Sequence, residues 1–119
     1  MREMMMDANL KFTRHDQNET QVVLQVDGDV TIHTSPRMRD QLKPLFTATM
    51  KEIRVELNGV DFMDSSGIAT LVEGLQWARL TGGRFILSGL SENVRDVFAL
   101  AKLDTVFDID SNVIEEKSA

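Results

Sequence analysis

The chain has 119 residues, of which 42% are hydrophobic and 27% charged, so we expect a single globular domain over residues 1–119. Its 13 basic and 19 acidic residues give a formal net charge of −6, which argues against direct binding of nucleic acid. The absence of cysteine excludes disulfides and thiolate metal sites. No apolar run approaches the ~20 residues that would span a membrane, so we expect no membrane insertion and a cytoplasmic location.

Five segments have the composition or period-two alternation of β-strands, namely residues 10–13, 22–26, 53–57, 84–88 and 106–109. The polar run 15–20 is expected to join the first two in a hairpin. Residues 53–57 alternate strictly between apolar and charged side chains, whereas 84–88 are apolar on both faces, as in a covered central strand. The last segment is predicted to be a short edge strand.

Three segments have helical periodicity. The first runs from Ser35 to Met50, with Ser35 as the cap, Pro36 at the first helical position and a kink or break at Pro44. The second helix stops at Gly82 and Gly83, and we expect it to bury the stripe of Ile68, Leu71, Val72, Leu75 and Ala78. The third helix begins at Ser91 and Glu92.

The alternation of strands and helices favours an α/β fold. We expect a small mixed sheet of about five strands with helices packed mainly on one face. Residues 1–9 and 111–119 are candidates for flexible ends, the latter with a short helix as the alternative.

The segment between strand 53–57 and the following helix carries the most suggestive chemistry. It contains Asp64, Ser65 and Ser66 where the helix should begin, so Asp64 or Ser65 is the expected N-cap. A helix start has free N–H groups and tolerates an anion, although a phosphate on Ser65 would be repelled by Asp64. Such a phosphate would change the contact surface of the domain without refolding it.

These residues resemble the phosphorylation segment of bacterial anti-sigma factor antagonists, which are members of the STAS domain family. The resemblance extends from about Leu10 to Ile109 and includes the stretches 26–30, 62–68, 83–87 and 94–98. It departs from the family at Thr31, where an acidic residue is common. The fold it implies is a small sheet with helices largely on one side.

The resemblance implies that the unphosphorylated domain binds an anti-sigma factor that is also a serine kinase, and that a phosphatase reverses the modification. Ser65 is then the phosphorylated residue. We predict a partner-binding surface around it made of Met63, Asp64, Ser66, Gly67, Thr70 and Trp77. Trp77 lies opposite the apolar stripe of its helix, together with Thr70 and Gly74, so it is either a docking anchor or an aromatic ring that is incidentally exposed or folded under a loop. No cofactor is implied for the domain itself, which we expect to be a monomer or weak dimer.

Two alternative functions stay open at this point. The first is a STAS accessory subunit of a phospholipid-transport ABC system, in which Ser65 need not be phosphorylated. The second is an enzyme that uses Ser65 with His33, which is disfavoured because the Gly-x-Ser-x-Gly elbow is missing. We therefore expect a protein that is not an enzyme. Neither His15 nor His33 has the spacing of a metal ligand, so no metal site is predicted.

Overall fold

Strands and helices alternate over residues 10–110, the part of the chain that the computed structural model describes. The strands are β1 (Lys11–Asp16), β2 (Gln21–Asp27), β3 (Glu52–Gly59), β4 (Arg84–Ser88) and β5 (Asp108–Asp110). The helices are α2 (Ser35–Leu42), α3 (Ser65–Thr81) and α4 (Glu92–Leu100), and a 3₁₀ turn, η1 (Lys43–Leu45), follows α2. The predictions for residues 1–9 and 111–119 fall outside the described residues.

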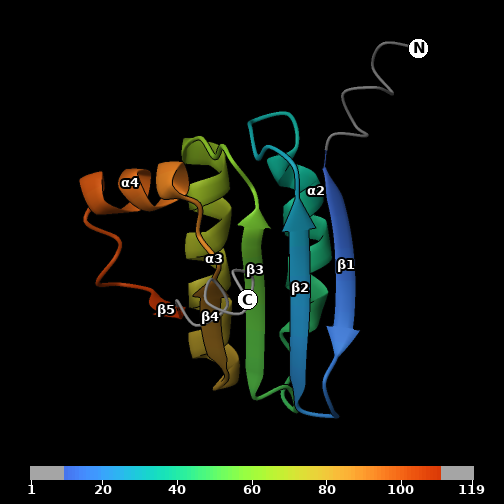
Figure 1. The fold of residues 1–119 in the computed structure, drawn as a ribbon. Coiled ribbons are helices and arrows are strands. Elements are labelled where there is room, and N and C mark those ends of the chain that lie inside the picture. The colour runs from blue at the N-terminus through green and yellow to red at the C-terminus, as the bar shows by residue number, and fades with distance from the viewer. Residues whose placement is uncertain (1–9, 111–119) are drawn as a thin grey trace, which may run out of the picture.

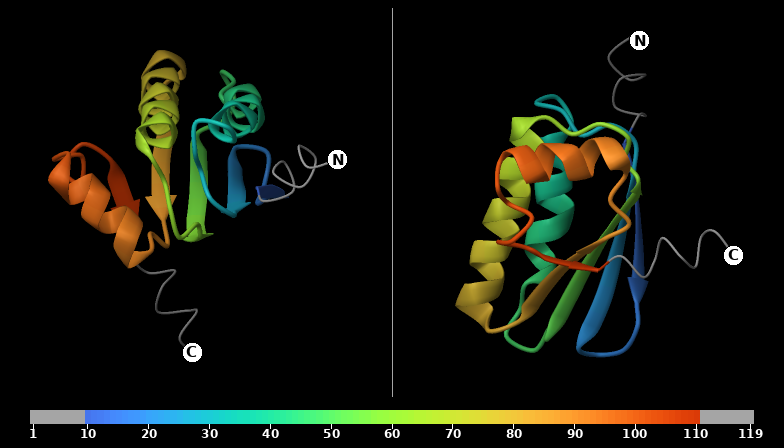
Figure 2. Two further views of the ribbon diagram at one scale, coloured as in Figure 1. Left: turned by 90° about the horizontal axis from the view of Figure 1, so that it is seen from above. Right: turned by 60° about the vertical axis from the view of Figure 1, so that its left-hand side comes forward.

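The strands form one mixed sheet in the order β1-β2-β3-β4-β5. β1 and β2 are an antiparallel hairpin, and every other neighbouring pair is parallel. Helices α2 and α3 lie on one face, whereas α4 lies beside the β4–β5 end of the sheet (Figures 1 and 2). The predicted fold class is therefore confirmed. Because β2, β3 and β4 are parallel, the loops that follow them lie at the same edge of the sheet.

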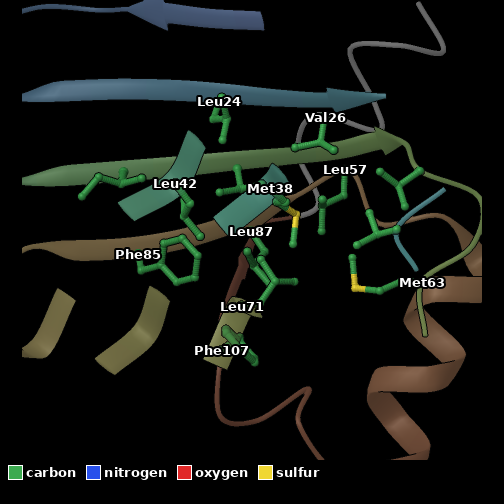
Figure 3. Packing of buried hydrophobic residues seen from close by; sticks show 14 of the residues in the cluster. Leu24, Val26, Met38, Leu42, Leu57, Met63, Leu71, Phe85, Leu87 and Phe107 are labelled. Atoms are coloured by element: carbon green, nitrogen blue, oxygen red, sulfur yellow. The ribbon is translucent and has the colours of Figure 1, made fainter. Parts of the chain in front are cut away.

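The hydrophobic core lies between the sheet and α2 and α3, where alternate side chains of the central strands meet the helices (Figure 3). In β2 the buried side chains are Val22, Leu24 and Val26, and in β3 they are Ile53, Val55 and Leu57. Val22 is paired with Ile53 and Leu24 with Val55, so the two strands contribute matching rows. All five predicted strands are present, although the last begins at Asp108 instead of at Val106.

The predicted break at Pro44 is confirmed, but the helix that begins at Ser35 does not resume after it and is shorter than the expected 35–50. It ends at Leu42, η1 follows, and the backbone is extended at Phe46. Pro44 accounts for the early end because it has no N–H to donate and its ring obstructs the preceding turn. The cap prediction is also wrong by one residue. Ser35 is already helical, and the N-cap is Thr34, whose hydroxyl instead donates to the Asp29 carbonyl oxygen.

The predicted stripe of helix α3 is confirmed in part: Leu71 and Ala78 are buried and the other three residues pack against the core, but small residues outside the stripe are buried as well. The buried residues are Gly67, Thr70, Leu71, Gly74 and Ala78, whereas Ile68, Val72 and Leu75 are only half-buried. A Cβ atom at Gly74 would lie 2.9 Å from Phe85 Cζ, so the missing side chain lets the helix pack closely on β4. Small residues and Leu71 therefore lie on the face turned toward the core, and Ile68, Val72 and Leu75 flank it.

Candidate functional site

The candidate site lies where the loops after β2 and β3 meet at the start of α3. The Val30 N–H donates to the Phe62 carbonyl oxygen at 3.0 Å, and the Asp64 N–H donates to the Val30 carbonyl oxygen at 3.0 Å. These two bonds form an isolated parallel bridge between Val30 and Met63. The bridge continues the β2–β3 pairing beyond the strands and fixes the two loops side by side.

Asp64 is the N-cap of α3, as one of the two predicted assignments states. Its Oδ1 accepts hydrogen bonds from the Ser66 N–H at 2.9 Å and from the Ser66 hydroxyl at 2.5 Å. Its Oδ2 accepts a hydrogen bond from the Ile32 N–H at 3.0 Å. The cap therefore has a second role, because one carboxylate links the start of α3 to the loop between β2 and α2.

The hydrogen bonds to Asp64 stabilise its charged form. Partial burial acts to raise the pKa of this carboxyl group, but the bonds donated by Ser66, Ile32 and Gly67 together hold the pKa below its ordinary value. Asp64 is consequently an anion at neutral pH, at the end of a helix that favours negative charge.

The structure distinguishes the two adjacent serines. Ser66 is half-buried, and its hydroxyl donates to Asp64. Ser65 is exposed in the first turn of α3, and its hydroxyl forms no hydrogen bond with any residue between 10 and 110. Of the two, only Ser65 presents a hydroxyl that is both exposed and unbonded.

Few other residues of the predicted partner-binding surface reach solvent. Met63, Gly67 and Thr70 are buried, and the Thr70 hydroxyl donates to the Ser66 carbonyl oxygen at 3.1 Å. A Cβ at Gly67 would lie 2.6 Å from both Met63 Cγ and Val30 Cγ1. The backbone therefore passes closely at Gly67, and the contact lies within the core and not on a partner-binding surface. We correct the surface accordingly and leave these three side chains out of it.

Trp77 does not lie on an exposed face of α3, although its position opposite the apolar stripe suggested one. It is half-buried and packs against the core, with its ring 5.6 Å from that of Phe46 in an edge-to-face arrangement. The Arg39 guanidinium lies 5.5 Å from the centre of the indole ring. These contacts give Trp77 a packing role between α3 and the segment that contains α2 and Phe46.

Two apolar residues near Ser65 were not predicted as site residues. Ile32 is 68% exposed and Phe62 is 51% exposed, and they belong to the two loops that Asp64 and the Val30–Met63 bridge join. The sequence gives little indication of their role, because an apolar residue in a short loop cannot be distinguished by pattern from a residue that is buried in the core. Exposed apolar side chains next to an exposed hydroxyl are typical of a protein-binding surface.

The two loops that adjoin Ser65 supply no lysine or arginine to neutralise a phosphate. Residues 28–34 and 60–68 contain Asp29, Asp61 and Asp64 but no lysine or arginine. In addition, Asp64 already accepts hydrogen bonds from the N–H groups of Ser66, Gly67 and Ile68, through its carboxylate or its carbonyl oxygen. The free N–H groups expected at this helix start are thus largely occupied, and an added dianion would increase an existing negative charge.

Within residues 10–110, no group of three acidic or histidine side chains is arranged to hold a metal ion. No helix in the same range is long and apolar enough to cross a membrane. His33 is exposed in the loop after β2, and its N–H donates to the Thr31 hydroxyl at 3.1 Å. Its side chain forms no hydrogen bond with Ser65 in the described part of the chain.

The fold and the site define a small α/β domain that presents one serine at a helix start between two joined loops. The profile of the STAS domain family matches residues 11–116, and the chain belongs to this family. A curated relative, the anti-sigma-B factor antagonist of Bacillus subtilis (strain 168), is 29% identical over 93 residues, covering 78% of this chain and 84% of the relative. The anti-sigma-B factor antagonist of Staphylococcus aureus (strain NCTC 8325 / PS 47) is 24% identical over 98 residues, covering 82% and 88%.

Solved structures share the fold. The unphosphorylated form of the anti-sigma factor antagonist SpoIIAA superposes with a TM-score of 0.73 at 22% identity, covering 91% of this chain and 96% of SpoIIAA. The phosphorylated form of SpoIIAA from Bacillus gives 0.66 at the same identity, covering 89% and 98%. An antagonist-like protein of Thermotoga maritima gives 0.77 at 23% identity, covering 88% and 92%.

Proposed function

We propose that this chain is an anti-sigma factor antagonist that regulates sigma-factor-dependent transcription by partner switching. In its unphosphorylated form it binds an anti-sigma factor that is also a serine kinase. Phosphorylation of Ser65 by that kinase releases it, and a phosphatase restores the binding form. The names of the curated relatives support this class of function, and the observation that carries it is the exposed, unbonded Ser65 hydroxyl.

The proposed binding surface is centred on Ser65 and contains Ile32, Phe62 and the solvent-facing side of Asp64. Ile32 and Phe62 supply apolar area that a partner can bury, at about 25 cal/mol for each Å² removed from water. The hydrogen bonds around Asp64 hold the two loops in one arrangement before binding, which lowers the entropy that association must lose.

The proposed release is electrostatic. A phosphate on Ser65 adds about −1.5 to −2 charges at neutral pH. The surface around it already carries the Asp64 charge and offers no lysine or arginine in the adjoining loops. Burying this dianion against a partner whose surface fits the neutral hydroxyl would leave it without a counter-charge, which strongly opposes binding.

The test is a binding measurement with each purified anti-sigma serine kinase of the source bacterium. We expect Ser65→Glu to weaken binding at least about tenfold, which corresponds to about 1.4 kcal/mol. Thr105→Glu is the matched control, because it adds the same charge at an exposed turn before β5 and should leave affinity unchanged. Equal affinities for the wild type and Ser65→Glu would contradict the proposal.

A second pair of variants tests the apolar part of the surface. Phe62→Ser and Ile32→Ser should each weaken kinase binding, because the exposed side chains lose area that the partner buries. Leu100→Ser removes an even more exposed apolar side chain, 85% accessible, from the far end of α4. That control should bind like the wild type. A loss of affinity in the control equal to that at Phe62 would place the interface elsewhere.

A further inference from the structure

The start of α3 offers two neighbouring hydroxyls, and the proposed function uses only one of them. Ser65 and Ser66 are both in the first turn of the helix. They differ in exposure and in bonding, since Ser66 is half-buried and its hydroxyl donates to Asp64 Oδ1. Something at this position must decide which serine a kinase modifies.

Phosphoryl transfer makes specific demands on the acceptor hydroxyl. Its oxygen forms a bond to the γ-phosphorus of ATP, the bond from that phosphorus to the bridging oxygen breaks, and ADP leaves. The hydroxyl proton passes to a base of the kinase. The acceptor must therefore extend from its own protein into the active site of the kinase, in line with the leaving group.

Ser65 meets these demands in the conformation observed, because its hydroxyl is exposed and unbonded within residues 10–110. Ser66 does not, because its hydroxyl points back to the cap. To reach a kinase it would have to give up a hydrogen bond to a charged group.

We propose that Asp64 is the positioning residue that selects the acceptor: by holding the Ser66 hydroxyl at the helix cap, it leaves Ser65 as the serine that is phosphorylated. This inference rests on the proposed function and adds to it the origin of the choice between adjacent serines. The second oxygen of Asp64 is bonded to the Ile32 N–H, so the carboxylate that engages Ser66 is itself fixed by the neighbouring loop.

A carboxylate bonded to a hydroxyl can also act as a general base, which would make Ser66 the better nucleophile. Two observations oppose that role here. Ser66 is less exposed than Ser65. The several hydrogen bonds to Asp64 also lower its pKa, which makes it a weaker proton acceptor than an ordinary aspartate. The two roles predict phosphate on different serines, so the experiment below separates them.

The first part of the experiment needs no kinase. The Asp64 carboxyl group is titrated by carbon NMR in the wild type, Ser65→Ala and Ser66→Ala. Ser66→Ala should raise the pKa of Asp64 toward its ordinary value, because it removes one hydrogen bond to the charged form. Ser65→Ala, the matched control, should leave that pKa unchanged. Equal pKa values in the wild type and Ser66→Ala would overturn the inference.

The second part maps the phosphorylated residue by mass spectrometry after incubation with ATP and the kinase that binds the chain. The wild type should carry phosphate on Ser65 alone, and Ser65→Ala should remain unmodified. In the double variant Ser65→Ala/Asp64→Ala, phosphate should appear on Ser66. We expect the Ser66 phosphate in the double variant to be at least about tenfold above the background signal measured for Ser65→Ala, since the transfer no longer has to break a charge-assisted hydrogen bond.

A second double variant that keeps a good N-cap residue controls for unfolding caused by the loss of Asp64. Asparagine is as good an N-cap as aspartate but has a neutral oxygen, so Ser65→Ala/Asp64→Asn should also release Ser66, to a smaller extent. Phosphate on Ser66 in Ser65→Ala with Asp64 intact would overturn the inference. So would folded double variants that still bind the kinase but stay unmodified. A wild-type chain that no kinase modifies would instead refute the proposed function itself, and the inference with it.

Discussion

The first turn of α3 and the body of the same helix are built by different forces. The first turn is fixed by hydrogen bonds to one carboxylate, that of Asp64, and keeps Ser65 exposed. The body is fixed by close packing of Leu71, Gly74 and Ala78 against the core. The polar turn can therefore accept or lose a charge while the packed body holds the fold in place. This difference is what a reversible contact surface on a stable domain requires.

The largest effect should follow from a change in the packed body. Leu71 is fully buried, and Leu71→Ala should lower the free energy of unfolding by about 3 kcal/mol, because it removes apolar contacts and leaves a cavity. Leu80→Ala is the matched control on the same helix. Leu80 is 83% exposed, so its replacement should change stability by less than about 0.5 kcal/mol. Chemical denaturation measures both, and equal losses would contradict the assigned buried face.

Replacement of Trp77 tests the packing of the helix body near the C-terminal end of α3. Trp77→Ala should cost about 2 kcal/mol of stability, since it removes the ring that contacts Phe46 and lies under Arg39. Trp77→Phe should cost less than half of that, because an aromatic ring can keep the contact with Phe46. The kinase affinity of a folded Trp77→Ala chain should match that of the wild type. Weaker binding with unchanged stability would restore Trp77 as a docking residue.

Gly67 lies at the junction of the two regions. Gly67→Ala should destabilise the domain by about 1 kcal/mol or more, because the new methyl group overlaps Met63 and Val30 by more than the gain in helix propensity offsets. Ala69→Ser adds one atom at an exposed position two residues later and should be nearly neutral. If thermal unfolding shows Gly67→Ala to be more stable than the wild type, the two loops are less tightly packed than described.

The smallest effect concerns pH and the polar turn. The folded-state pKa of Asp64 is lower than that of the unfolded chain, so its contribution to stability is present above the unfolded value, near pH 4, and is lost as the pH falls through the folded value. Stability measured down the acid limb should therefore fall more steeply for the wild type than for Asp64→Asn. Parallel curves for the two chains would show that the pKa of Asp64 is not lowered.

Sequence patterns predicted the five strands and placed the cap at Asp64 or Ser65, because these depend on local alternation and on a short-range hydrogen bond. They predicted the buried face of α3 only in part, because Leu71 and Ala78 were expected there but Gly67, Thr70 and Gly74 were not. There, glycine and threonine face the core because the sheet approaches closely, and a hydrophobic count assigns such residues to the surface. The link from Asp64 to Ile32 joins residues 32 positions apart in the chain, which no local pattern reveals. Ile32 and Phe62 were missed for the same reason, since their exposure depends on how two loops meet.

The central claim is that phosphorylation of Ser65, without any other change in the chain, releases the chain from the kinase that it otherwise binds. The most direct measurement compares the affinity of one kinase for the unmodified chain and for chain fully phosphorylated at Ser65, with the site verified by mass and the fold verified by circular dichroism. We predict unchanged secondary structure and a dissociation constant at least about tenfold larger for the phosphorylated chain. Equal dissociation constants for the two forms would contradict the account.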